Sequence, residues 1–88
     1  MKFEKDTSGI ERYIGFDIHK EYALVGGQNA RQEWVMQPRR VSMEKFREWA
    51  QANLHPGDAA IIETTTNVWD VYDIVAPLVS YAVVAHAG

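Results

Sequence analysis

The chain of 88 residues is long enough for one small domain, and its 47% hydrophobic and 24% charged residues are ordinary for a globular protein. A formal net charge of −3 excludes a strongly basic surface that would hold nucleic acid by itself, and the absence of cysteine excludes disulfides and thiolate metal sites. No apolar run reaches the length of a membrane span and the amino terminus has no signal-peptide core, so we expect a cytoplasmic protein without a membrane partner.

The first half of the chain predicts three consecutive strands. Residues 1–11 are a polar lead-in, and the domain is expected to occupy residues 12–88. Runs of strand-forming residues at 12–18, 21–27 and 32–37 are separated by short, turn-like segments. Links this short join antiparallel neighbours, so a meander of three strands is expected.

Asp17 is the unusual residue of the first strand. Two-residue alternation places Ile14, Phe16 and Ile18 on one face and places Asp17 with Tyr13 and Gly15 on the other. Burying a carboxylate without a partner is costly, so this position needs an explanation.

The second half of the chain alternates helices and strands. Ser42 is a suitable amino-terminal cap for a helix, which ends at the sequence HPGD of residues 55–58. A short apolar strand is predicted at 59–62. Asn67 caps the next helix, and Pro77 ends or kinks that helix before a last strand at 81–85. Because an apolar strand stands so close to Gly88, we expect the chain to be part of a longer protein.

This order of elements predicts that two acidic residues meet. The helix after the third strand can return the chain by a right-handed crossover, which lets strand 59–62 lie parallel to strand 12–18 and beside it. Asp17 and Glu63 then each lie near the carboxyl end of a strand, and neighbouring strands are about 4.8 Å apart. Open α/β sheets bind their ligands at this edge.

Two converging carboxylates are suitable ligands for Mg²⁺, which prefers hard oxygen donors. A bound cation also removes the repulsion between two close acids. Other interpretations stay open at this point. Asp17 could accept hydrogen bonds from turn amides at a strand end, and Glu63 could be a solvated loop residue.

Three segments carry a family resemblance: YIGFDIHKEYALVGG from Tyr13, ETTTNVWDVYDIV from Glu63 and YAVVAHAG from Tyr81. Together they resemble the amino-terminal domain of IS110-family transposases, the Piv/MooV-like DNA recombinases. The resemblance covers residues 12–88. It implies a ribonuclease H-like (RuvC-like) fold, with a βββαβαβ mixed sheet and flanking helices, in truncated form.

The resemblance also implies a function. The family uses four acids, in the order Asp, Glu, Asp, Asp, for metal-dependent cleavage and transfer of DNA strands. Asp17 matches the first acid and Glu63 the second, both as catalytic and metal-binding residues, with Mg²⁺ or Mn²⁺ as cofactor. The last two acids would follow Gly88, so the 88-residue chain is expected to be inactive by itself. Transposon-end and target DNA, an element-encoded guide RNA and a homo-oligomer are the implied partners.

Two positions depart from the family pattern. Thr66 stands where the family usually has glycine, so the loop after Glu63 is expected to differ, and His19 stands where serine is common. Two alternative functions remain. A non-enzymatic binding or dimerisation module of the same fold needs no metal. An ATPase of the actin or sugar-kinase type would need a glycine-bearing phosphate loop after Asp17, which DIHKEYA does not provide.

Several other polar and aromatic residues have ordinary structural interpretations. The threonines at 64–66 could contact phosphate, but threonines before a helix more often cap it. The three histidines are too scattered to suggest a metal site, and two of the three tryptophans fall on helical apolar stripes. The basic residues Arg39, Arg40, Lys45 and Arg47 could touch a phosphate backbone, but a solvated surface is the commoner arrangement.

Overall fold

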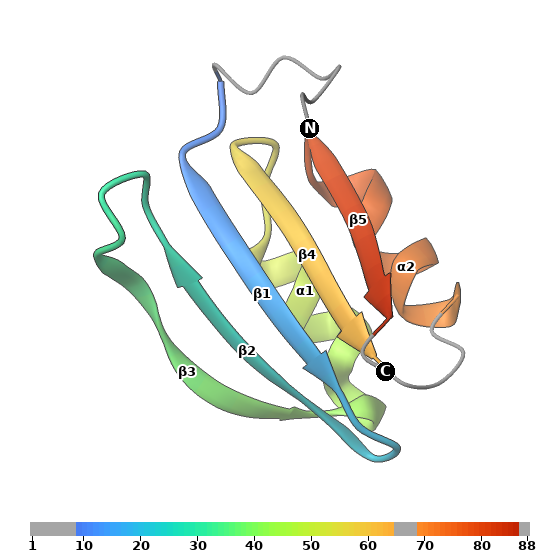
Figure 1. The fold of residues 1–88 in the computed structure, drawn as a ribbon. Helices are drawn as coiled ribbons and strands as arrows, with labels where there is room; N and C mark the ends of the chain where they lie inside the picture. The colour runs from blue at the N-terminus through green and yellow to red at the C-terminus, as the bar shows by residue number, and fades with distance from the viewer. Residues whose placement is uncertain (1–8, 65–68, 87–88) are drawn as a thin grey trace.

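The computed structural model describes residues 9–64 and 69–86, which form an α/β fold with a mixed five-stranded sheet and two helices (Figure 1). The strands are β1 (Arg12–Ile18), β2 (Tyr22–Gln28), β3 (Trp34–Ser42), β4 (Asp58–Thr64) and β5 (Tyr81–His86), and the helices are α1 (Phe46–Asn53) and α2 (Trp69–Val75). Within these residues, neither helix is long and apolar enough to cross a membrane.

The strands are ordered β3-β2-β1-β4-β5 across the sheet. β1, β2 and β3 form the expected antiparallel meander, whereas β4 pairs with β1 and β5 pairs with β4 in the parallel sense. Short turns can join only antiparallel neighbours, and the two parallel connections each contain a helix. The predicted placement of β4 beside β1 is therefore confirmed.

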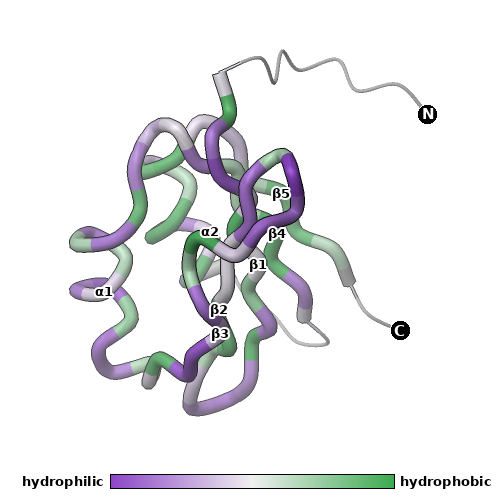
Figure 2. Tube along the Cα trace, turned by 90° about the vertical axis from the view of Figure 1, so that its left-hand side faces the viewer, coloured by the Kyte–Doolittle hydropathy of each residue, from purple (hydrophilic) through white to green (hydrophobic). Residues whose placement is uncertain are grey.

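Both helices pack on one face of the sheet, which we call the helix face (Figures 1 and 2). Alternate residues of the strands point to this face and bury their side chains under α1 and α2. The core contains Ile14, Phe16, Ala23, Val25, Val41, Phe46, Ala50, Leu54, Ala60, Ile62, Val71 and Val75. Phe16 and Phe46 meet edge to face with their ring centroids 5.9 Å apart, which ties β1 to α1.

The opposite face of the sheet, which we call the open face, is covered by no helix of the described part of the chain. Large hydrophobic side chains remain exposed there, among them Tyr13, Leu24, Trp34 and Val83. The alternation that buries Ile14 and Phe16 brings their neighbours Tyr13, Gly15 and Asp17 to this face.

The third strand differs from the prediction. β3 extends to Ser42, whereas the sequence indicated that it ends at residue 37. The register shifts between Val25 and Gly27, where two residues of β3 lie opposite one residue of β2. Pro38 lies in this bulge, on an edge strand, where its missing N–H breaks no regular ladder bond.

The predicted helix starts are only partly correct. Ser42 occupies the N-cap position of a 3₁₀ turn over Met43–Lys45 that leads into α1, but its side chain makes no capping hydrogen bond. Pro77 does end the second helix: α2 stops at Val75 and a 3₁₀ turn over Ala76–Leu78 follows. Asn67 lies outside the described residues, as do residues 1–8 of the lead-in.

A part-buried ion pair joins the starts of β1 and β4. Asp58 is fully buried, and its carboxylate accepts bonds from Arg12 Nε at 2.7 Å, from a terminal Arg12 nitrogen at 2.8 Å and from the His55 amide at 2.9 Å. The hydrogen bond to Asp58 raises the pKa of Arg12 above its ordinary value. This pair was not predicted, because Asp58 was assigned to the segment that ends the first helix.

Candidate metal site at the carboxyl ends of two parallel strands

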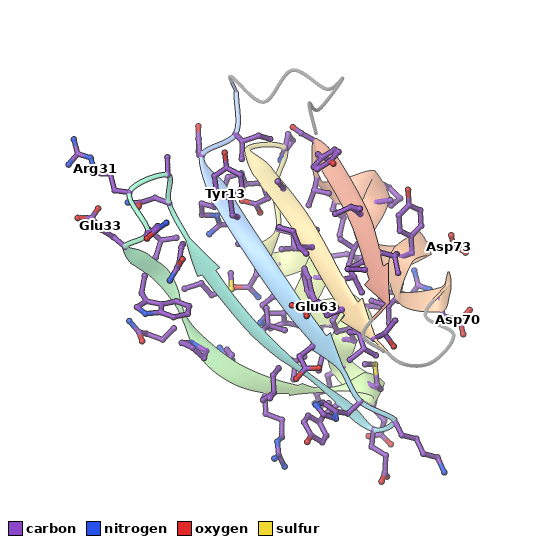
Figure 3. The ribbon with its side chains drawn as sticks, in the orientation of Figure 1. Tyr13, Arg31, Glu33, Glu63, Asp70 and Asp73 are labelled. Atoms are coloured by element: carbon purple, nitrogen blue, oxygen red, sulfur yellow. The ribbon has the colours of Figure 1, made fainter. Side chains whose placement is uncertain are left out.

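Asp17 and Glu63 are direct neighbours across the parallel β1–β4 pair. Both side chains are exposed and both lie on the open face, where Figure 3 shows Glu63 in front of the sheet. Adjacent strands are about 4.8 Å apart, so both carboxylates are within reach of a single cation. The predicted convergence of these two acids is therefore present in the fold, whereas their metal-binding role stays a prediction.

The electrostatics of the pair are unfavourable without a cation. Like charges directly opposite each other on neighbouring strands repel. Asp17 has a polar side-chain neighbour, His19, whose Nε2 lies 3.3 Å from Oδ2 of Asp17. The side chain of Asp17 nevertheless remains 60% exposed, so its carboxylate keeps room for a further ligand.

His19 was given no role by the sequence, yet it has a defined setting. Its ring stacks on Tyr22, with centroids 4.6 Å apart and an interplanar angle of 17°. The guanidinium of Arg40 lies over the same tyrosine ring, 4.1 Å from its centroid. His19, Tyr22 and Arg40 thus form a group beside Asp17. The signal in the sequence was the two-residue spacing between Asp17 and His19 at a strand end.

The donor set suits a hard cation. Among residues 9–64 and 69–86, no group of three or more histidine or acidic side chains is arranged to hold a metal. Asp17 and Glu63 therefore offer two carboxylates and no complete cage. Mg²⁺ is commonly held by one or two carboxylates, with water or phosphate oxygens filling its other positions.

Other residues singled out by the sequence lie elsewhere. Thr64 is buried at 2% exposure and alternates with Glu63, so it points to the helix face rather than toward the carboxylates. Thr65 and Thr66 lie outside the described residues. His55 lies beside Asp58 at the opposite end of the sheet from His19, so these two histidines share no site.

The predicted basic cluster is divided between the two faces. Arg40 lies on the open face, over Tyr22. Arg39 and Lys45 line a pocket between β3 and α1 on the helix face, whereas Arg47 is exposed outside that pocket. Alternation along β3 explains the split, because consecutive residues of a strand point to opposite faces.

Comparison of the chain with protein-family models, with curated proteins and with solved structures gives no match. The family resemblance accordingly rests on the quoted motifs, and the function rests on what the arrangement of Asp17 and Glu63 can do chemically.

Proposed function

We propose that the chain is the amino-terminal part of a ribonuclease H-like catalytic domain that performs metal-dependent cleavage and transfer of DNA strands, as in IS110-type transposases. One observation carries the proposal: Asp17 and Glu63 lie directly opposite each other at the carboxyl ends of adjacent parallel strands, on a face that no described helix covers. The strand order β3-β2-β1-β4-β5, with β4 parallel to β1, supports the same assignment.

Asp17 and Glu63 would hold Mg²⁺ or Mn²⁺ from the two strands and present it to a phosphodiester on the open face. A metal bound there supplies charge neutralisation at the phosphate and activation of an oxygen nucleophile. The role of the two carboxylates is to fix the position of that charge. They also discriminate in favour of a divalent cation, because each is repelled by the other when no cation is present.

His19 fits this site as a positioning residue. Its contact with Asp17 limits the rotation of the carboxylate, and its stacking on Tyr22 limits its own. Glu63 has no corresponding side-chain contact among the described residues, so it can adapt to a ligand.

DNA from transposon ends and targets, an element-encoded guide RNA and further copies of the chain are the partners that accompany this proposal. The net charge of −3 is consistent with a site that approaches phosphate through a metal rather than through a basic surface.

A paramagnetic metal titration tests the proposal. Mn²⁺ is added to the ¹⁵N-labelled chain, and the broadening of amide signals is mapped. We expect broadening centred on residues 15–19 and 61–64, because both carboxylates project from these segments. The double variant Asp17→Asn/Glu63→Gln should lose it.

The matched control is Asp70→Asn/Asp73→Asn, which removes two exposed carboxylates from α2, away from the open face (Figure 3). This variant has the same net charge as the test variant and should keep the broadening. Broadening at another place, or its absence up to millimolar Mn²⁺, would contradict the proposal.

A second candidate function is a non-enzymatic binding or dimerisation module. It is favoured by a hollow of about 220 Å³ on the open face, lined by Gly15, Leu24, Gly26, Trp34 and Pro38. Exposed apolar side chains around a hollow are typical of protein interfaces. This candidate predicts no broadening that depends on Asp17 and Glu63, so the Mn²⁺ titration separates the two functions.

A further inference from the structure

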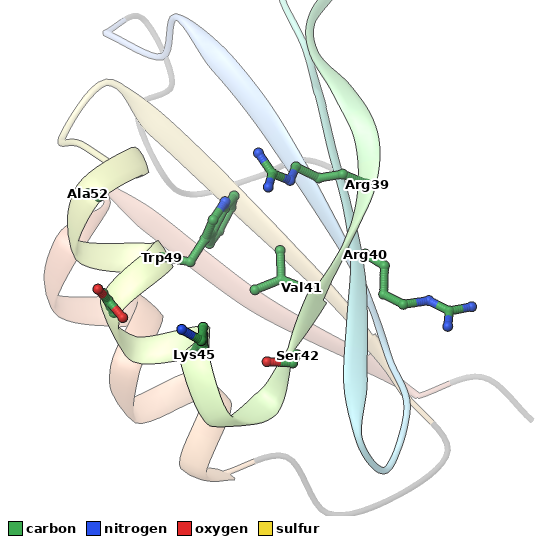
Figure 4. A pocket seen from close by; sticks show the side chains of 8 residues that line it. Arg39, Arg40, Val41, Ser42, Lys45, Trp49 and Ala52 are labelled. Carbon is green, nitrogen blue, oxygen red and sulfur yellow. The ribbon is translucent and has the colours of Figure 1, made fainter.

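A second pocket lies on the helix face, between the edge strand β3 and the first turns of α1. Its volume is about 370 Å³, which is in the range of small-molecule sites. Val41 and Trp49 supply its apolar surface, and Arg39, Ser42, Lys45 and Glu48 surround it with polar groups (Figure 4). It is separated from Asp17 and Glu63 by the sheet itself, because those two residues lie on the open face.

The pocket concentrates positive charge in an acidic chain. Three basic residues, Arg39, Arg40 and Lys45, line it against one carboxylate, Glu48, whereas the whole chain carries a net charge of −3. The guanidinium of Arg40 lies over Tyr22, so Arg39 and Lys45 are the two cations available to the pocket. In the part of the chain that the structure describes, the side chains of Arg39 and Lys45 form no ion pair. Figure 4 shows Arg39 reaching from β3 toward α1, Lys45 at the opposite end, and Arg40 directed away. Two free cations thus flank one cavity.

Trp49 adds a hydrogen-bond donor without an acceptor. Its indole Nε1 is buried and has no partner within residues 9–64 and 69–86. The ring is held by Phe16 and Phe46, with centroid distances of 6.3 Å and 6.1 Å, so the N–H cannot easily turn to solvent. Figure 4 shows this nitrogen on the side of the indole that faces the guanidinium of Arg39. A buried donor without an acceptor is rare in folded proteins and requires an explanation.

The hydrogen-bond donors around the pocket could all be satisfied by one ligand. A guanidinium, an ammonium, a hydroxyl and an indole N–H border the same space, and an anion with several oxygens would accept from more than one of them. Arginine matches phosphate particularly well, because its N–H groups pair with two oxygens at once. The long side chains of Arg39 and Lys45 are exposed, so they can move aside to admit a ligand to the indole N–H.

We propose that this pocket binds a phosphate group, either of a free nucleotide or of a nucleic-acid strand, with Arg39 and the Trp49 N–H as its main donors and Lys45 as the second cation. The site needs no metal and does not involve Asp17 or Glu63. The proposal for this pocket can therefore be tested independently of the proposed catalytic function.

The three tryptophans make a direct test possible, because each indole N–H gives its own signal in a ¹⁵N spectrum. The Trp49 signal is assigned from the variant Trp49→Phe. The labelled chain is titrated in EDTA at constant ionic strength with inorganic phosphate, with a nucleoside monophosphate and with a short single-stranded DNA, and sodium chloride serves as the blank. We expect the Trp49 indole signal to shift in a saturable manner with all three phosphate compounds and not with chloride.

Variants identify the donors. Arg39→Gln/Lys45→Gln should weaken binding at least tenfold. The matched control Arg31→Gln/Arg47→Gln, which removes two exposed cations outside the pocket, should bind as the unchanged chain does. The substituted side chains are all exposed, so the remaining signals should stay in place and report an intact fold.

The relative affinities identify the source of the phosphate. Tighter binding of the DNA than of the monophosphate would assign the pocket to a nucleic-acid strand, and equal binding would assign it to a single nucleotide. No saturable shift of the Trp49 signal with any phosphate compound would overturn the proposal. Equal weakening by both double variants would overturn it as well, because general charge would then explain the effect.

Discussion

The two ends of the β1–β4 pair use the same alignment for opposite purposes. Arg12 is the strand partner of Asp58, and five residues farther along β1, Asp17 is the partner of Glu63. In each pair, the two residues are 46 positions apart in the sequence. At the first end a carboxylate meets a cation in the interior, and at the second end a carboxylate meets another carboxylate in solvent.

Burial explains the contrast. Asp58 is removed from water, so its charge has to be compensated, and Arg12 and the His55 amide together satisfy both carboxylate oxygens. Asp17 and Glu63 stay in solvent, which tolerates their repulsion at small cost. The Arg12–Asp58 end, which we call the saturated end because both carboxylate oxygens have donors, therefore serves stability. The Asp17–Glu63 end, which we call the unsaturated end, leaves its exposed carboxylates accessible to a ligand.

The largest expected effect comes from breaking the saturated end. Asp58→Asn leaves Arg12 without its buried counter-charge, and removing one partner of a buried pair typically costs about 3–5 kcal/mol. Because the Arg12 side chain is 21% exposed, we expect a loss at the lower end of this range, about 3 kcal/mol, in the free energy of unfolding, measured by urea denaturation. Replacing both partners, as Arg12→Met/Asp58→Leu, should recover part of the loss. A double variant that is less stable than Asp58→Asn would show that the charges themselves are required.

A glycine pair extends the comparison from the ends of the strands to their two faces. A Cβ added to Gly27 would lie 2.6 Å from Cδ1 of Ile14, in the packed core of the helix face. Gly27→Ala should therefore cost about 1–3 kcal/mol through overpacking. In the matched variant Gly15→Ala, the new Cβ meets nothing closer than 4.0 Å on the open face, and we expect almost no change. Equal thermal shifts for the two variants would contradict the assignment of the faces.

The smallest effect is expected at the unsaturated end. Asp17→Asn removes a like-charge contact with Glu63, so it should raise the free energy of unfolding by about 0.5 kcal/mol when no metal is present. High salt should abolish this gain, because exposed charges are screened. Parallel urea titrations at low and high sodium chloride measure both effects. A loss of stability at low salt would mean that the contact of Asp17 with His19 outweighs the repulsion.

The sequence was sufficient for most of the fold. The alternation along residues 12–18 and the helices before and after β4 indicated that Asp17 and Glu63 would meet. Strand alternation and helical periodicity are local patterns, so both can be recognised in the sequence. The end of β3 was predicted too early, because Pro38 indicates a break unless the bulge that accommodates it is known. Ser42 was correctly placed before the helical segment, but its predicted capping hydrogen bond is absent.

Features that depend on distant contacts could not be predicted in this way. Asp58 ends a sequence of residue types that are typical of turns, and only its partner Arg12, 46 positions earlier, explains why it is buried. That common separation of the two pairs was nevertheless visible in the sequence, and alignment of β1 with β4 on Asp17 and Glu63 would have matched Arg12 with Asp58. Arg39 and Lys45 of the anion pocket were visible as members of a basic cluster. The pocket itself was not predicted, because the Trp49 N–H becomes unusual only once its surroundings are known.

The ion pair between Arg12 and Asp58 also bears on how this protein can change in length. A slip of one residue between β1 and β4 would turn Glu63 to the opposite face of the sheet. The ion pair opposes such a slip from about 17 Å away, the length of five strand residues. Insertions or deletions in the turn between β2 and β3, or between α1 and β4, therefore leave the alignment of Asp17 with Glu63 unchanged as long as Arg12 still pairs with Asp58. The length of the intervening chain is free to vary while the two catalytic candidates stay opposite each other.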